Sequence, residues 1–262
     1  MHVLVTGATG GIGRGICEVL ARREPDLTLS VAGSAAGAKL DALLQSLREL
    51  GVQAHGVAGD VTQVEQARGI VQQAIDTAGD LDALVCVAGA SGPGRLADLP
   101  VEQWDLTFNL NTRSVFLMAQ AAHASLKRSR GSITAIASMS GLHPHPGYGA
   151  YSPAKAALVM LCRQLAQEWG PEGIRTNSVC PGMVRTPLTE AVYQDADTLA
   201  RREALVPMGR IGQPDDIGHA VHYLMGSGAA YVNGQNLVVD GGVADHMLSM
   251  IPGRPGKPPV KG

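Results

Sequence analysis

The sequence predicts one α/β domain built on a doubly wound parallel sheet with helices on both faces, and three observations support this fold class. Short apolar runs rich in β-branched residues alternate with longer amphipathic runs along the chain. The apolar runs are hydrophobic on both faces, as in ALVCVA at 83–88, which is typical of parallel strands buried between two helical layers. A length of 262 residues, 45% of them hydrophobic, is sufficient for one large core.

The expected elements alternate between strand and helix, an order that predicts right-handed βαβ units. The expected strands are the apolar runs at 3–6, 27–32, 53–57, 83–87, 132–137, 174–180 and 237–239. The expected helices are the amphipathic runs at 12–22, 38–50, 64–78, 101–128 and 151–169. No repeat or linker interrupts this order, so we expect one domain over residues 1–250. The segment 251–262, rich in Pro, Gly and Lys, is expected to be a flexible tail.

Composition argues against several functional classes. A formal net charge of -2 gives no field that would attract nucleic acid or an anionic membrane. No run reaches about 20 apolar residues, and Met1 leads almost directly into a strand, so neither a membrane span nor a signal peptide is expected. We therefore expect a cytoplasmic protein whose partner is a small molecule. The cysteines form no CxxC pair and are expected to be buried free thiols: Cys17, Cys86, Cys162 and Cys180.

The first expected strand ends in a glycine-rich turn, TGATGGIG at 6–13. Glycines let the backbone approach a diphosphate, and the N–H groups at a helix N-terminus favour that anion. The spacing TGxxxGxG differs from the common GxGxxG and resembles that of the classical short-chain dehydrogenase/reductase family. This resemblance implies a single-domain Rossmann-like fold and a nicotinamide dinucleotide, NADP or NAD, held by Thr6, Gly7, Gly11, Ile12 and Gly13.

Two later segments extend the resemblance at the nucleotide. Asp60 and Val61 follow the third expected strand, where the family uses an Asp to fix the adenine ring. Asp60 is also suited to cap the following helix, and the two roles are compatible. Ala88 and Gly89 match the second half of the family's NNAG motif, but both asparagines are absent. That departure removes the hydrogen bonds that usually steady the sheet centre.

Tyr151 and Lys155 stand at i and i+4 and share one face if their segment is helical. A cation near a phenol favours the phenolate, so we expect Lys155 to lower the pKa of Tyr151 and allow proton exchange closer to neutral pH. Ser138 ends the fifth expected strand thirteen residues before Tyr151, the spacing of the catalytic Ser and Tyr in the family. Ser140 is the alternative. The resemblance implies that Ser138 holds the carbonyl oxygen and Tyr151 exchanges its proton.

A fourth catalytic residue is expected in the helix at 101–128. Asn111 lies seven residues after Trp104 and five before Phe116, as does the family's Asn that kinks this helix and holds a water beside the lysine. Asn109 does not fit this spacing. An Asn at either position is also compatible with plain polar helix surface.

The sequence signals for the adenosine and nicotinamide ends of the cofactor site are weaker. At the end of the second strand, Gly33 and Ser34 provide neither the carboxylate that selects NAD nor the cation that selects NADP. Because no carboxylate repels a phosphate there, the sequence slightly favours NADP(H). The segment PGMVRT matches the family's PGxxxT, which implies nicotinamide contacts from Pro181, Gly182, Val184 and Thr186.

The histidines are ambiguous. His219 and His222 stand at i and i+3 without a third ligand, so we expect a polar helix face and no metal site. His143 and His145 lie in the loop between Ser138 and Tyr151, where loop surface is favoured over a substrate contact. The segment 186–207 occupies the place of the family's substrate lid.

Together these motifs predict an NAD(P)-dependent oxidoreductase that transfers a hydride between the nicotinamide and a carbonyl or secondary alcohol. The alternative is a 3-oxoacyl carrier-protein or 3-oxoacyl-CoA reductase, which Glu172 disfavours because carrier-protein reductases have a basic residue there. A catalytically silent nucleotide sensor is less favoured, since Tyr151 and Lys155 are both present. The resemblance also implies a homo-oligomer, a tetramer or dimer.

Overall fold

The computed structural model describes residues 1–246 and confirms the predicted α/β class. Seven parallel strands form one sheet in the order β3-β2-β1-β4-β5-β6-β7. The strands are β1 His2–Thr6, β2 Thr28–Gly33, β3 Gln53–Ala58, β4 Ala83–Cys86, β5 Ser132–Ile136, β6 Arg175–Pro181 and β7 Asn236–Val239. The order reverses between β1 and β4, which is where an open α/β sheet forms its ligand crevice. The predicted tail lies outside the described residues.

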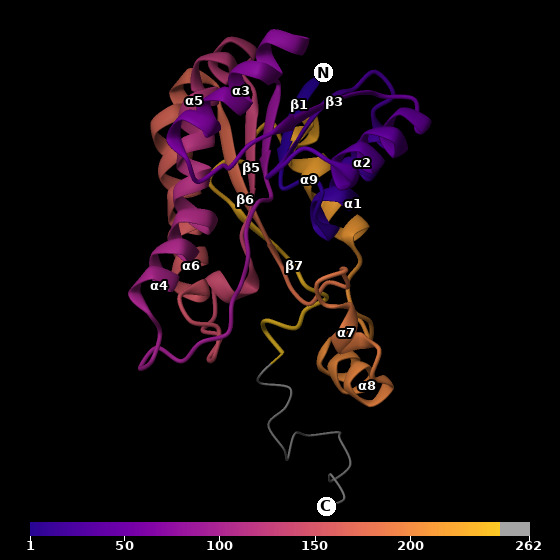
Figure 1. The fold of residues 1–262 in the computed structure, drawn as a ribbon, viewed down its shortest axis with the longest axis vertical. Helices are drawn as coiled ribbons and strands as arrows, with labels where there is room; N and C mark the ends of the chain where they lie inside the picture. Colours follow the sequence, from indigo (N-terminus) through magenta and orange to yellow (C-terminus); the bar gives the residue numbers. More distant parts are fainter. Residues whose placement is uncertain (247–262) are drawn as a thin grey trace, which may run out of the picture.

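Helices cover both faces of the sheet, as Figure 1 shows. One layer holds α3 Val64–Ala78, α5 Ser114–Ser129 and α6 Tyr151–Trp169, and the other holds α1 Gly11–Arg23, α2 Ala38–Glu49 and α9 Pro214–Met225. Two apolar clusters, one on each face, form the core between these layers. Strands such as ALVC in β4 are buried along their whole length because helices shield both sides.

Two regions differ from regular alternation. The expected helix at 101–128 is α4 Val101–Phe108 and α5, joined by a π-helical turn at Asn109–Arg113. The segment after β6 contains two short helices, α7 Glu190–Tyr193 and α8 Ala196–Leu205, which lie beyond the sheet at the lower end of Figure 1. Among the helices of residues 1–246, none combines the length and the apolar character that a bilayer crossing requires.

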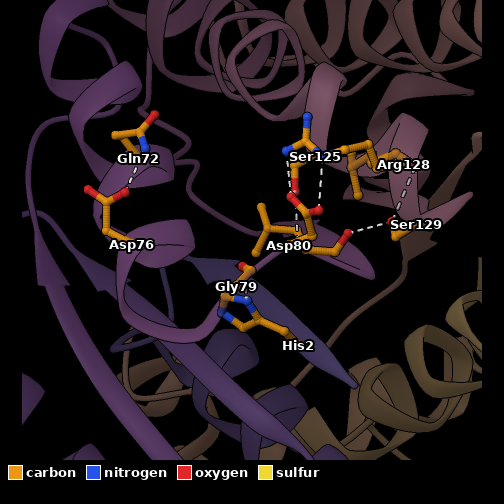
Figure 2. Close-up of polar contacts among 10 residues, drawn as sticks. His2, Gln72, Asp76, Gly79, Asp80, Ser125, Arg128 and Ser129 are labelled. Carbon is orange, nitrogen blue, oxygen red and sulfur yellow. Dashed lines mark hydrogen bonds and ion pairs between the residues drawn. The ribbon is translucent and has the colours of Figure 1, made fainter.

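A polar cluster lies at the amino ends of the strands (Figure 2). His2 at the start of β1 contacts the Gly79 carbonyl through Nδ1 at 3.0 Å. Asp80 accepts two hydrogen bonds from the Arg128 guanidinium and one from the Ser125 hydroxyl, which holds its pKa below the usual range. These contacts connect the turn after α3 to the end of α5, at the amino ends of the strands.

Candidate functional site

A cavity of about 420 Å³ lies at the carboxyl ends of the strands, at the β1/β4 switch point. Most of the predicted site residues line it: Gly7, Gly11, Ile12, Gly13, Gly33, Ser34, Asp60, Val61, Ala88, Gly89, Ser138, Tyr151, Lys155, Pro181, Gly182 and Thr186. Thr6, Asn111 and Val184 are buried and are not among its lining residues. Sequence reasoning did not single out Leu188, an exposed lid residue that also lines the cavity and has no motif of its own.

The glycine-rich turn leaves room that side chains would fill. Gly7 has φ +62°, and a Cβ there would lie 2.6 Å from the Ala88 nitrogen. A Cβ at Gly13 would lie 2.2 Å from the Gly7 carbonyl oxygen, and one at Gly11 would lie 2.7 Å from the Thr186 Cβ. Helix α1 begins here without a side-chain cap. The free N–H groups of its first turn and the bare backbone fit a diphosphate.

The opposite end of the cavity is suited to an adenosine. Gly33 ends β2, and Ser34 follows it as an exposed residue on the cavity wall. Asp60 accepts from the Thr62 N–H at 2.9 Å and from the Thr62 hydroxyl at 2.8 Å. The expectation that Asp60 caps α3 is therefore wrong in detail: its side chain closes a local turn, and the N-cap position of α3 is Gln63.

Ser138 and Tyr151 meet at the centre of the cavity. Ser138 follows β5 and caps a short 3-10 turn, where its Oγ accepts from the Ser140 N–H at 3.0 Å. Tyr151 is the first residue of α6, and its side chain is hydrogen-bonded to that of Ser138. Ser140 is buried outside the lining, and its Oγ lies 3.0 Å from His145 Nδ1. The geometry therefore favours Ser138 over Ser140 as the reacting serine.

Lys155 lies one helical turn beyond Tyr151, as the spacing predicted. Its Nζ donates to the Ile136 carbonyl at 2.7 Å and lies 5.7 Å from the centre of the Tyr151 ring. Burial lowers the pKa of Lys155 to about 8. Burial also raises the pKa of Tyr151, and the hydrogen bond from Ser138 opposes this only in part. The sequence analysis expected Lys155 to lower the pKa of Tyr151, whereas in this structure the pKa of Tyr151 is raised, chiefly by burial.

Asn111 occupies the π-helical turn and is fully buried. Its Nδ2 donates to the Ala90 carbonyl at 2.8 Å and to the Thr107 carbonyl at 2.9 Å. Its Oδ1 has no partner among the described residues. A Cβ at Gly89 would lie 2.7 Å from that oxygen and 3.2 Å from Lys155 Nζ. The missing side chain of Gly89 lets the two polar groups approach, and an unpaired buried oxygen there is suited to bind a water.

The remaining expectations concern the lid and the histidines. A Cβ at Gly182 would lie 2.5 Å from the Asp240 Cβ, so the turn after β6 requires glycine. His222 pairs with Glu24 at 2.7 Å, from Nε2 to Oε1. The part of the chain described here contains no group of three or more His, Cys, Asp or Glu that could hold a metal ion. All four cysteines are buried and free.

Comparisons with known proteins agree with this geometry. A family model described as Enoyl-(Acyl carrier protein) reductase matches residues 7–244. The L-rhamnose 1-dehydrogenase (NAD(P)(+)) of Sphingomonas sp. (strain SKA58) is 35% identical over 243 residues, which cover 92% of this chain and 95% of that protein. The 3-oxoacyl-(acyl-carrier-protein) reductase FabG of Thermotoga maritima is 30% identical over 241 residues, with 92% and 96% covered.

Solved structures show the same relationship. The Pseudomonas aeruginosa RhlG/NADP active-site complex superposes with a TM-score of 0.86 at 31% identity, covering 93% of this chain and 96% of that one. Family model, curated relatives and solved structures thus coincide over nearly the whole chain. The chain belongs to the short-chain dehydrogenase/reductase family, whose members are NAD(P)-dependent oxidoreductases of alcohol and carbonyl groups.

Proposed function

We propose that this enzyme interconverts a small carbonyl compound and its secondary alcohol, with Ser138, Tyr151, Lys155 and Asn111 as the catalytic residues and NADP(H) as the favoured nucleotide. The observation that carries the proposal is the meeting of Ser138, Tyr151 and Lys155 in the cavity that the glycine-rich turn opens. When bound, the nicotinamide supplies or accepts the hydride. The glycine-rich turn would hold its diphosphate, and Pro181, Gly182, Val184 and Thr186 would face its carboxamide.

The catalytic side chains bind the substrate oxygen and transfer its proton. Ser138 Oγ is positioned to donate to the substrate oxygen, and Tyr151 Oη gives a proton to that oxygen during reduction or takes it during oxidation. The buried ammonium of Lys155 favours the phenolate as it forms. Asn111 Oδ1 holds a water next to Lys155, which would replace the proton that Tyr151 gives up. This arrangement needs no metal ligand.

The nucleotide preference rests on the end of β2. Lys155 is the only basic side chain among the described residues that line the cavity, and Asp60 is the only acidic one. At the end of β2 itself, Gly33 and Ser34 offer a 2'-phosphate a hydroxyl and no carboxylate. This favours NADP(H) through hydrogen bonding, without the cation that usually enforces the choice.

The carrier-protein reductase is the second candidate, and the surface near α5 opposes it. Glu172 Oε1 lies 3.1 Å from Lys127 Nζ, and Glu172 Oε2 lies 2.6 Å from His123 Nε2. The carboxylate neutralises the cation that an acidic carrier would seek, so a free small substrate is favoured. The hydrogen bonds from Lys127 and His123 also lower the pKa of the Glu172 carboxyl.

Association into a homo-oligomer is part of the proposal. Large apolar side chains are exposed on α4, α5 and α6, which form one side of the molecule in Figure 1. They include Val101 and Leu106 on α4, Phe116 on α5 and Met160 on α6, at 69%, 67%, 41% and 57%. Burying such side chains against a second copy would remove apolar surface from water.

A panel of ketones and secondary alcohols, assayed by nucleotide absorbance with NADP(H) and with NAD(H), tests the proposal. We expect turnover with at least one carbonyl class. Tyr151→Phe should lower kcat by at least about a hundredfold, since positioned acid/base catalysis contributes on that order. Nucleotide binding should change little. Turnover near that of the unmodified enzyme in Tyr151→Phe would refute the assigned mechanism.

A further inference from the structure

One histidine of the loop between β5 and α6 is hydrogen-bonded to both ends of that loop. His145 Nδ1 lies 3.0 Å from the Oγ of Ser140, which stands two residues after Ser138. The backbone N–H of His145 donates to the Oγ of Ser152 at 3.1 Å, and Ser152 directly follows Tyr151. His145 therefore connects the two segments that carry the reacting side chains.

Ser140 links His145 to Ser138 through its backbone. The N–H of Ser140 donates to Ser138 Oγ at 3.0 Å and so fixes the oxygen that is to bind the substrate. Ser140 is 5% exposed, and within residues 1–246 the hydrogen-bond partner of its hydroxyl is His145 alone. Without the imidazole, this buried hydroxyl would be unpaired, and the turn that carries the Ser140 N–H would lose the contact that fixes it.

The backbone around this network is held by packing and by hydrogen bonds of its own. The 3-10 turn after β5 packs directly on α6, since a Cβ at Gly141 would lie 2.8 Å from the carbonyl carbon and oxygen of Lys155. Farther along the loop, Gly94 exchanges two backbone hydrogen bonds with residues 147–149, both at 2.9 Å. A substitution of His145 should therefore change its side-chain hydrogen bond without displacing the loop.

The surroundings of His145 favour the form of its ring that can accept this hydrogen bond. Burial, and to a smaller extent the charge of Arg202, lowers the pKa of His145. The ring is therefore neutral at pH 7, and with its proton on Nε2 it accepts from the Ser140 hydroxyl at Nδ1. The Tyr148 ring, whose centre lies 3.8 Å from that of His145, packs against the imidazole.

We infer that His145 is a positioning residue, which acts through Ser140 to fix the hydroxyl of Ser138 for the substrate oxygen. This inference rests on the proposed function and adds a residue to it. His145 does not line the cavity that holds the reacting groups, so it acts on them through this contact. Because Ser138 is to stabilise the charge that develops on the substrate oxygen, loss of His145 should lower kcat more than it changes KM.

Two substitutions of His145 separate its hydrogen bond from the packing of its ring. His145→Phe keeps a ring against Tyr148 but removes the acceptor, and we expect kcat to fall about tenfold with little change in KM. His145→Asn places an amide near the position of Nδ1 and should recover most of the lost kcat. His143→Phe, which changes an exposed histidine of the same loop, is the matched control and should leave kcat and KM unchanged.

The pH profile of alcohol oxidation is a measurement that a merely structural role of His145 would not change. Tyr151 must be ionised to take the substrate proton. Burial raises the pKa of Tyr151, and the hydrogen bond from Ser138 opposes that rise. The acid limb of kcat/KM should therefore shift to higher pH in His145→Phe and return in His145→Asn. The other titratable groups near the phenol are unchanged in these variants: Lys155, Tyr148 and Cys180.

Ser140→Ala removes the same hydrogen bond from its other side without removing a titratable group. It should lower kcat and shift the acid limb as His145→Phe does, and the double variant should be no slower than either single variant. Losses that add in the double variant, or an unchanged kcat and pH profile in His145→Phe, would overturn the inference and leave the proposed function intact. An unmodified enzyme that turns over no carbonyl or alcohol with either nucleotide would refute both. Nucleotide binding, followed by fluorescence, verifies that each variant is folded.

Discussion

Replacing Lys155 by methionine should stabilise the empty enzyme at neutral pH while it abolishes activity. The ammonium is 3% exposed, and its only hydrogen bond among the described residues goes to the Ile136 carbonyl. Burial lowers the Lys155 pKa from 10.5 to about 8. At about 1.36 kcal/mol per pKa unit, keeping the charge inside at pH 7 costs about 3 kcal/mol.

Methionine removes this cost but leaves the Ile136 carbonyl without its hydrogen-bond donor. The loss of that hydrogen bond offsets about 1–2 kcal/mol of the stabilisation. The net gain at pH 7 is about 1–2 kcal/mol, or a rise in Tm of a few degrees for a domain of this size. The sign follows from proton binding: because the folded pKa is lowered, the unfolded chain binds more protons between pH 8 and 10.5. The stability contributed by this site therefore rises with pH across that window.

The measurement is thermal unfolding followed by circular dichroism at pH 7 and pH 10, without nucleotide. The difference in unfolding free energy between Lys155→Met and the unmodified enzyme should fall by about 2 kcal/mol between the two pH values. Lys39→Met, which changes an exposed lysine on α2, is the control and should show no such fall. A stability difference that is the same at both pH values would refute the argument that the buried charge dominates.

Two further predictions concern selectivity. Gly33→Asp should weaken NADPH binding by about tenfold or more and NADH binding much less, because the new carboxylate would repel a 2'-phosphate. The side chain has room, since a Cβ at Gly33 would meet only Ala35 and Thr9, at 3.4 Å. If a fluorescence titration gave an unchanged ratio of the two Kd values, the ribose would lie elsewhere. For one β-keto acyl group presented free and on its carrier protein, kcat/KM should be nearly equal in the unmodified enzyme and should rise for the carrier in Glu172→Arg. A strong carrier preference before the substitution would instead identify a fatty-acid or polyketide reductase.

Periodicity and motif spacing predicted the fold and most of the residues that line the cavity. The strands fell within one or two residues of their expected positions because both-face burial leaves a continuous apolar run in the sequence. The thirteen-residue spacing selected Ser138 over Ser140, since only the residue at the end of β5 faces the cavity. The kink expected at Asn111 is a π-helical turn, whose extra residue leaves no mark in the apolar pattern.

Properties that depend on the tertiary surroundings of a residue could not be predicted from the sequence. The sign of the Tyr151 pKa shift is set by burial beneath the loop and the strands, which the YxxxK pattern does not contain.

Cys86 and Val87 stand where the family's NNAG motif has its two asparagines, at the centre of the sheet and, for Cys86, near Lys155. The centre of the sheet is still held, because the Val87 and Ala88 N–H groups donate to Thr6 Oγ1 at 3.2 and 3.5 Å. Cys86 takes the place of the first asparagine, and burial raises the pKa of its thiol, so it stays neutral beside the ammonium. The thiols of Cys162 and Cys180, near Lys155, are raised in pKa for the same reason. Neutral thiols therefore lie near Lys155, and burial, not a neighbouring charge, is the main cause of its lowered pKa, while its ammonium donates to the Ile136 carbonyl at 2.7 Å.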